Sequence, residues 1–338
     1  MLFRSNNSTV GAYSLYNNTG GYSNVAIGYE AGRANTTGYV NTLVGYQAGY
    51  SNTTVPGLTA IGNSAGKNYN PGSDVWVSTF VGNNAGGATT SGTANTFVGG
   101  SAGVANTTGA SNAAFGAGAL FSNTTASRNT AVGYQAGYSN TTSTGITAVG
   151  YKTLYSSTGA RNTAVGGGDD VTYNAALYSN TTGTDNAAFG IGTLGSNTTG
   201  AYNTALGVAA LYYSVAASNN TAVGFQAGYN TTASNNTAVG YQAAYSNTTG
   251  ANSVAVGFSA LYSNTTGAAN IGVGYNAAKA NTTGTQNNSF GFRSLETNST
   301  GNYNNAFGAY TLFNNVGSNN AAFGDTALYA NTRSEEHT

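Results

Sequence analysis

The chain repeats one short pattern of polar and apolar residues nineteen times. Each copy has the form N-T-A-V-G, in which a large apolar residue stands directly before a closing glycine. Of the 18 intervals between closing glycines, thirteen are 17 residues long, three are 16, one is 20 and one is 24. A period held this strictly is typical of a solenoid, in which every repeat forms one coil. The closing glycines are Gly11, Gly28, Gly45, Gly62, Gly82, Gly99, Gly116, Gly133, Gly150, Gly166, Gly190, Gly207, Gly224, Gly240, Gly257, Gly274, Gly291, Gly308 and Gly324.

The period and the alternation together favour β-structure. Seventeen residues are too few for a two-helix repeat, and glycine recurs inside every copy, which disfavours a helix. The apolar positions alternate with polar or small ones, as in strands. We therefore predict an all-β fold, a β-solenoid (β-roll) of about 19 coils with two short strands and two turns per coil. At ~4.8 Å per coil, the 18 intervals predict a rod roughly 86 Å long.

Alternation also assigns each column of the repeat to a face. The residue before the closing glycine is large and apolar in all 19 copies, so we expect it to point into the core. The residue two positions before the closing glycine is Ala in 13 copies. This residue and the glycine itself would then point outward. This outer strip of Ala and Gly predicts either a contact surface between chains or a bend that demands glycine.

Other columns predict how a coil is completed. A small residue stands three positions after the closing glycine and is followed by Leu or Gly, which we expect to form the second inner wall. Asn stands four positions before the glycine in 15 of 19 copies, where stacked amides can bond from coil to coil. In the N-T-T-G turns, as at Asn106 to Gly109, we expect side chains to bond the local backbone.

Composition excludes several classes of function. Only 18 of 338 residues are charged and the net charge is zero, so no basic surface is available for nucleic acid. Cysteine is absent, and the single histidine, His337, lies in the last six residues. Nucleophilic dyads and His- or Cys-ligated metals therefore lack their parts, and we expect no enzyme activity, no metal and no cofactor. No apolar run is long enough for a membrane helix, so we expect no membrane insertion.

Two insertions interrupt the single array that we assign to residues 1–332. They lie near residues 67–78 and 167–175, and insertions in solenoids map to surface loops, which often carry recognition. The sequence predicts either binding protrusions, the first taking a glycan through Trp76 and Tyr69, or tolerated insertions without a function. Asp169 and Asp170 resemble a calcium-binding turn, but the motif occurs once, which favours a solvated loop. Residues 333–338 abandon the repeat and are interpreted as an artefact. The candidate binding residues are Tyr69, Asp74, Trp76, Asp169 and Asp170.

Sequons form a further ladder, seven residues after the closing glycine. They predict either N-linked glycans on the filament surface or turn chemistry, and the close spacing of coils favours the second. The candidate positions are Asn35, Asn52, Asn106, Asn123, Asn140, Asn197, Asn247, Asn264, Asn281 and Asn298.

The repeat resembles a known family of surface fibres. The segments Asn252 to Ala260 (N-S-V-A-V-G-F-S-A) and Asn24 to Gly28 (N-V-A-I-G) are similar to the head repeats of trimeric autotransporter adhesins, and also to shaft repeats of phage and virus tail fibres. The resemblance covers Asn7 to about Tyr329. It implies a left-handed β-roll in which three chains pack side by side. It also implies an extracellular, cell-surface or virion-surface location.

Two functions of different classes follow. The first is a structural, adhesive fibre segment that self-associates, as a homotrimer or a laterally packed filament, and presents binding regions to surface glycans or a host surface. The second is an ice- or surface-binding solenoid, suggested by Thr three residues before the glycine in ten copies. A glycosylated extracellular filament subunit is a variant of the first. Because these Thr share a face with the large apolar column, we expect them to be buried, which favours the fibre.

Overall fold

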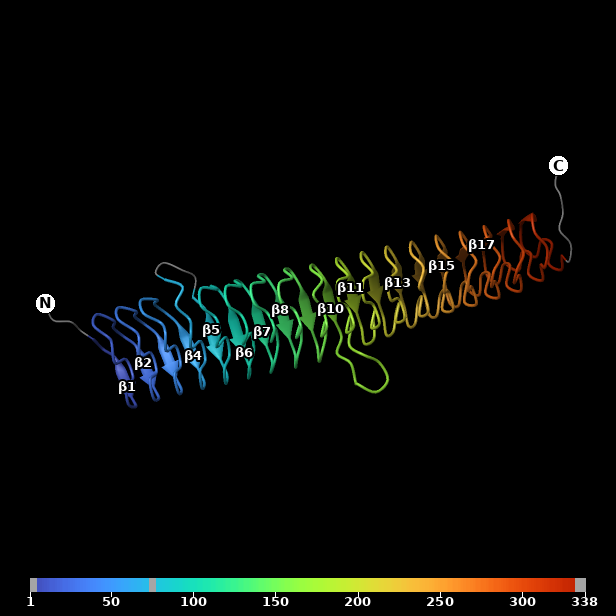
Figure 1. Cartoon of the computed structure of the whole chain (residues 1–338). Coiled ribbons are helices and arrows are strands. Elements are labelled where there is room, and N and C mark those ends of the chain that lie inside the picture. Colours follow the sequence, from blue (N-terminus) through green and yellow to red (C-terminus); the bar gives the residue numbers. More distant parts are fainter. Residues whose placement is uncertain (1–4, 73–76, 332–338) are drawn as a thin grey trace. The chain divides into compact units, whose positions relative to one another are not determined.

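The computed structural model describes residues 5–72 and 77–331, which form an all-β solenoid and contain no helix. Each repeat contributes one three-residue strand to a parallel sheet (Figure 1). The predicted fold class is thus confirmed. The strands are β1 (Ser8–Val10), β2 (Val25–Ile27), β3 (Thr42–Val44), β4 (Thr59–Ile61), β5 (Thr79–Val81), β6 (Thr96–Val98), β7 (Ala113–Phe115), β8 (Thr130–Val132), β9 (Thr147–Val149), β10 (Thr163–Val165), β11 (Ala187–Phe189), β12 (Thr204–Leu206), β13 (Thr221–Val223), β14 (Thr237–Val239), β15 (Val254–Val256), β16 (Ile271–Val273), β17 (Asn288–Phe290), β18 (Asn305–Phe307) and β19 (Ala321–Phe323).

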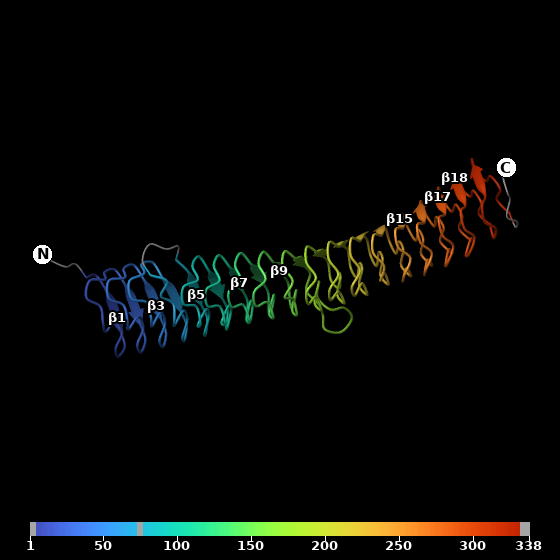
Figure 2. The same cartoon turned by 45° about the horizontal axis from the view of Figure 1, so that its top comes forward.

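Consecutive strands pair in parallel, column on column, within each of two compact units, residues 1–163 and 164–338. In the first unit Thr130 of β8 is paired with Thr147 of β9. Insertion does not shift the register, because Thr59 of β4 pairs with Thr79 of β5 across 20 residues. The insertion at residues 167–175 leaves the stack as a loop beside β10 and β11 (Figure 1), and the turned view shows the same yellow-green loop projecting from the coils (Figure 2).

The second wall of the coil is a run of turns and not the second strand that the sequence predicted. Residues two and four positions after the closing glycine have left-handed φ values even where they are not glycine, as in Gln135 (53°) and Leu120 (51°). A third left-handed corner precedes each strand, as at Arg128 (61°). Such conformations cost ~1 kcal/mol or more each for residues with a Cβ. They persist because the backbone N–H groups of these corners donate to the neighbouring coil, as Gln135 does to Ala117 at 2.9 Å.

The strands bury the column that the sequence placed outside. Ala131, in the middle of β8, is fully buried, whereas Thr130 and Val132 on either side of it are exposed, Val132 by 38%. The same order, with only the middle residue buried, holds in β2 to β19. Our assignment of the large apolar column to the core was therefore wrong, as was the expected burial of the Thr column. Thr and Val do share a face, but it is the face toward solvent.

The thinness of the coil explains this inversion. The strand faces the second wall directly, and that wall contributes the expected small residue and the Leu that follows it, such as Ala119 and Leu120, both buried. Little volume remains between the walls, so the strand can supply only a small side chain. A close-packed interior tolerates neither overfilling nor a void, and the larger β-branched residue therefore points out.

Exceptions to the small inner column are compensated within the core. Where the strand supplies Leu43, Phe80 or Phe97, the Leu position of the second wall is glycine. A Cβ added at Gly86 would lie 2.4 Å from the Phe80 ring, and one at Gly103 would lie 2.5 Å from Phe97. In other coils the strand supplies Ala and the second wall supplies Leu, as with Ala114 and Leu120. Where both positions are small, as at Ala131 and Gly137, side chains of adjacent coils fill the space: a Cβ added at Gly137 would lie 3.1 Å from Leu120 and 3.3 Å from Ile146.

The predicted Asn ladder before each strand is confirmed. Asn112 is buried, and its backbone N–H donates to the side-chain Oδ1 of Asn95 in the preceding coil at 2.9 Å. Its own Nδ2 donates to the carbonyl oxygen of Ala126 at 2.9 Å. Asn129 continues the series, since its N–H donates to the Oδ1 of Asn112 at 3.0 Å. These bonds satisfy polar groups that water cannot reach, at a net gain of ~1 kcal/mol each.

The closing glycines are explained by the coil itself. Gly133 has a φ of 135°, and a Cβ at this residue would lie 2.4 Å from the carbonyl oxygen of Gly150 in the next coil. Backbone of one coil thus lies directly on backbone of the next, within the same chain. Of the two interpretations of the Ala and Gly strip, the bend is supported, and a contact surface between chains is excluded because the Ala column is inside.

We predict that Ala131→Asp destabilises the solenoid by about 3 kcal/mol or more, because it buries a carboxylate without a partner. Val132→Asp, on the adjacent residue, should cost less than about 1 kcal/mol in the dilute monomer, since its side chain reaches water. Melting followed by circular dichroism measures both. Equal losses of stability in the two variants would show that the faces are not distinguished as described.

We also predict that Gly133→Ala lowers the melting temperature sharply, because both its φ and the contact with Gly150 reject a Cβ. The matched control is Gly100→Ala, at a site where an added Cβ meets no atom within 4 Å. Gly100→Ala should melt close to the wild-type chain. A Gly133→Ala chain that does the same would remove the steric explanation of the repeat's glycine.

Candidate functional site

The outward face is the most regular surface of the described residues. We define it as three columns: the residues three and one before the closing glycine and the residue directly after it. In the second unit these columns include Thr221, Val223 and Phe225 in one coil, all partly or well exposed. The strand register repeats the three columns from each coil to the next, and ideal strand spacing sets the step at ~4.8 Å.

Aromatic side chains form continuous stacks on this face. In the column after the closing glycine, ring centroids lie 5.4, 5.0, 5.1 and 5.2 Å apart in sequence, with nearly parallel planes. The residues of this stack are Phe225, Tyr241, Phe258, Tyr275 and Phe292. In the column before the glycine, Phe290, Phe307 and Phe323 stack at 4.8 and 5.1 Å. An apolar surface of this kind is unusual on a soluble monomer.

Stacking determines which part of each ring a partner can reach. Within these columns the ring faces are covered by the rings of adjacent coils, so that the edges point outward. A sugar normally packs its C–H groups on an aromatic face, and such faces are available only at the end of a stack. The outward face therefore favours contact with another apolar surface over stacking of sugars.

A second set of tyrosines lies beside the insertion at residues 167–175. Tyr212, Tyr229 and Tyr245 stack with centroids 5.6 and 5.1 Å apart. Tyr173 of the insertion meets Tyr212 edge-on at 5.4 Å, and its hydroxyl accepts a hydrogen bond from Gln226 Nε2 at 3.1 Å. Burial among these rings raises the pKa of the Tyr229 phenol above its ordinary value. The insertion is thus anchored along its own coils, a contact that the sequence did not reveal.

The carboxylate of Asp169 accepts hydrogen bonds from the loop that contains it. Oδ1 accepts backbone N–H groups from Val171, Thr172 and Tyr173 at 3.0, 2.7 and 3.0 Å. These bonds lower the pKa of Asp169 from 3.8 to about 2. Asp170 is exposed and has a left-handed φ of 59°. The exposure of both residues fits the solvated loop of the two predictions, with Asp169 bonded to the backbone of its own turn. Among the described residues no group of three or more His, Cys, Asp or Glu lies together as a metal site would require.

The first insertion places its candidate residues differently from expectation. Tyr69 is fully buried and packs edge-on against Phe80, with ring centroids 5.4 Å apart. Burial also raises the pKa of its hydroxyl. It occupies the column that holds Asn in other coils, so it fills the core and is not available to a glycan. Asp74 and Trp76 lie outside the described residues.

The ten candidate glycosylation sites all lie inside the coils. Asn123 is representative: its Nδ2 donates to Asn106 Oδ1 in the preceding coil at 2.9 Å and to the Ala126 carbonyl of its own turn at 3.2 Å. The side-chain nitrogen that a glycan would occupy is therefore buried and already bonded. This geometry supports the turn interpretation of the sequons. The buried candidates are Asn35, Asn52, Asn106, Asn123, Asn140, Asn197, Asn247, Asn264, Asn281 and Asn298.

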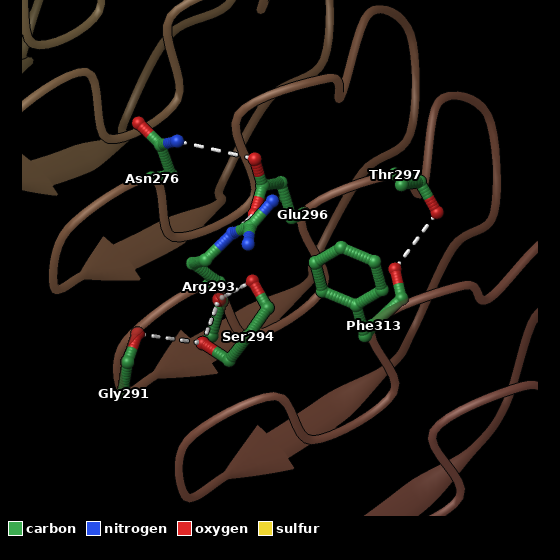
Figure 3. A network of polar contacts seen from close by, with 8 residues as sticks. Asn276, Gly291, Arg293, Ser294, Glu296, Thr297 and Phe313 are labelled. Carbon is green, nitrogen blue, oxygen red and sulfur yellow. Dashed lines mark hydrogen bonds and ion pairs between the residues drawn. The ribbon is translucent and has the colours of Figure 1, made fainter. Parts of the chain in front are cut away.

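Two pairs of opposite charges, Glu30 with Arg33 and Arg293 with Glu296, lie at coil corners. Arg293 and Glu296 form an ion pair three residues apart, and Asn276 of the preceding coil donates to Glu296 at 3.1 Å (Figure 3). The Arg293 guanidinium also lies over the Phe313 ring, 4.9 Å from its centroid. The carboxylate bond to Glu296 contributes to a raised pKa of Arg293. Each charge is neutralised within its own corner, so this network holds coils together and offers no free catalytic group.

Comparison with known proteins adds no assignment. Neither a scan of protein-family models nor a search of curated proteins finds a match for this chain. The described part of the chain also contains no helix that is long and apolar enough to cross a membrane.

The Asp169 bonds make a prediction about pH. A carboxylate whose pKa is lowered by folding stabilises its loop above its ordinary value of 3.8, and this stabilisation is lost as the pH falls through about 2. The amide proton shifts of Val171, Thr172 and Tyr173 should therefore titrate together with a midpoint near pH 2 in an NMR titration. Asp169→Asn should abolish that transition. A midpoint near 3.8 in the wild-type chain would contradict the three hydrogen bonds.

Proposed function

We propose that this chain is a structural fibre segment. Its role would be to span distance with a stack of identical coils and to associate with further copies of itself. The observation that carries this proposal is the repetition of one coil, with the same hydrogen bonds and the same buried columns, throughout each unit. Such repetition creates a long uniform surface but brings no set of reactive groups together. A structural role, without catalysis, cofactor or metal, is the function that suits it best.

The setting that we propose for the fibre is extracellular, on a cell or virion surface. The likeness of the repeat to trimeric adhesin heads and tail-fibre shafts motivates this setting, together with assembly as a trimer or a lateral filament and a left-handed coil. The near absence of charge and the backbone hydrogen bonds that join each coil to the next suit a fibre exposed to varying salt and pH outside the cell. Adhesion to surface glycans or a host would then belong to loops or to an end of the fibre.

One observation supports the ice- or surface-binding alternative: the Thr column points to solvent. Two features count against it. Thr is replaced by Ala, Val, Ile or Asn in coils such as those of β7, β15, β16 and β17. The exposed rings of Tyr241 and Phe258 stand beside the strands and interrupt a level surface. An ordered water layer needs a flat and uniform array, so the fibre remains the proposal.

We predict that the chain in solution scatters X-rays as an elongated particle. Nineteen coils at ~4.8 Å should give a long dimension of roughly 86 Å or more, with a β-type circular dichroism spectrum. Association side by side would thicken the particle, and association end to end would lengthen it. A compact, spherical scattering profile would contradict the fibre. Thermal hysteresis in the same preparation would instead favour the ice-binding alternative.

A further inference from the structure

We propose that the outward face of the solenoid is the contact surface between two copies of this chain. This inference rests on the proposed fibre function and identifies the surface through which the fibre assembles. It replaces the strip of Ala and Gly, whose Ala column the structure places inside the coil. Three properties of the face support it: its apolar exposure, its lack of charge and its period.

The exposed apolar groups are large and contiguous. In the second unit Leu206 is exposed by 49%, Phe225 by 40% and Phe323 by 70%. These residues stand in columns that the strand register aligns, so their exposed surfaces join into one continuous strip. Soluble monomers rarely expose apolar patches larger than a few hundred Å2, and larger ones mark interaction sites. The strip thus requires a partner of similar polarity.

Charge selects the class of partner. Neither of the two strand columns contains a charged residue in any of the nineteen repeats, and the column after the glycine contains one, Asp325. A basic or acidic partner would lose hydration of its charges and find no opposite charge in return. A second copy offers an equally uncharged surface. The exposed Thr hydroxyls can keep hydrogen bonds with water or with the partner at the margin.

The available area sets the strength of the contact. Nine strands at ~4.8 Å and three columns about 12 Å wide give roughly 450 Å2 per unit on each copy. Two copies in contact along one unit therefore bury about 900 Å2 in total, which is typical of a weak association. A contact that also covers the other unit would add the same area again, toward the ~1,200–2,000 Å2 of specific complexes.

The period favours a second copy over an unrelated apolar protein. Side chains on the face form ridges that recur at every coil, so close packing along the whole strip needs a partner with the same ~4.8 Å step. Another copy meets this requirement at every coil. Two such sheets would pack face to face about 10 Å apart, with the rings and β-branched side chains of each filling the gaps of the other.

The test compares two double variants in the second unit. Val239→Glu with Val256→Glu places two carboxylates on the outward face in consecutive coils. Thr249→Glu with Thr266→Glu places two carboxylates at the same coil spacing in the exposed N-T-T-G turns, away from the face. Sedimentation equilibrium should show the wild-type chain and the turn variant as associated species. The face variant should need at least a tenfold higher concentration to associate, because burying two unpaired charges opposes contact.

Circular dichroism verifies that both variants keep the solenoid. If the face variant unfolds, Val239→Thr with Val256→Thr supplies a milder loss of apolar surface and should still weaken association. A wild-type chain that stays monomeric at all concentrations would overturn the proposal, as would a face variant that associates like the wild type or a turn variant that is equally impaired. An elongated chain that still associates although the face variant behaves like the wild type would leave the fibre function standing while this surface failed.

Discussion

The contact between closing glycines of successive coils determines the rest of this structure. Each of these glycines takes a φ that excludes other residues, and its backbone lies against the carbonyl of the next one, as with Gly45 and Gly62. That contact allows the coils to stack at the spacing of a parallel sheet. Once the stacking is set, every other position of the repeat lies above its equivalent. Ladders of like residues are the consequence, on the inside and on the outside.

Stacking decides where polar groups find partners. Because equivalent residues of successive coils lie above one another, the buried amide of Asn123 donates to Asn106 in the preceding coil and also to its own turn. The left-handed corners at residues such as Gln135 and Leu120 are tolerated for the same reason, since the neighbouring coils accept their N–H groups. Strain in one coil is therefore offset by bonds between coils. This also explains why the repeat can contain so many polar residues and few charges.

The outward face follows from the same geometry. A coil whose walls approach closely buries Ala from most of its strands, and a larger residue such as Phe80 only where the second wall has glycine. The large side chains before and after the closing glycine are left outside, many of them in stacks. Their ring faces are satisfied within the chain, but their edges and the β-branched residues beside them are not. A fibre that self-associates would cover this surface. The same feature that stabilises one chain thus favours contact between chains.

The period of the repeat was enough to predict the solenoid, one strand of each coil and the ladder of Asn112 and its equivalents, because a fixed interval forces identical residues into columns. The second strand that was also predicted is a run of turns. Parity likewise paired Thr130 with Val132 on one face. It could not determine that Ala131 between them points inward, since alternation defines two faces without naming the inner one. That choice depends on the distance to the second wall, which only tertiary packing sets. For the same reason the burial of Tyr69 and of the sequon asparagines, and the anchoring of Tyr173 on Tyr212, became evident only in the folded coil.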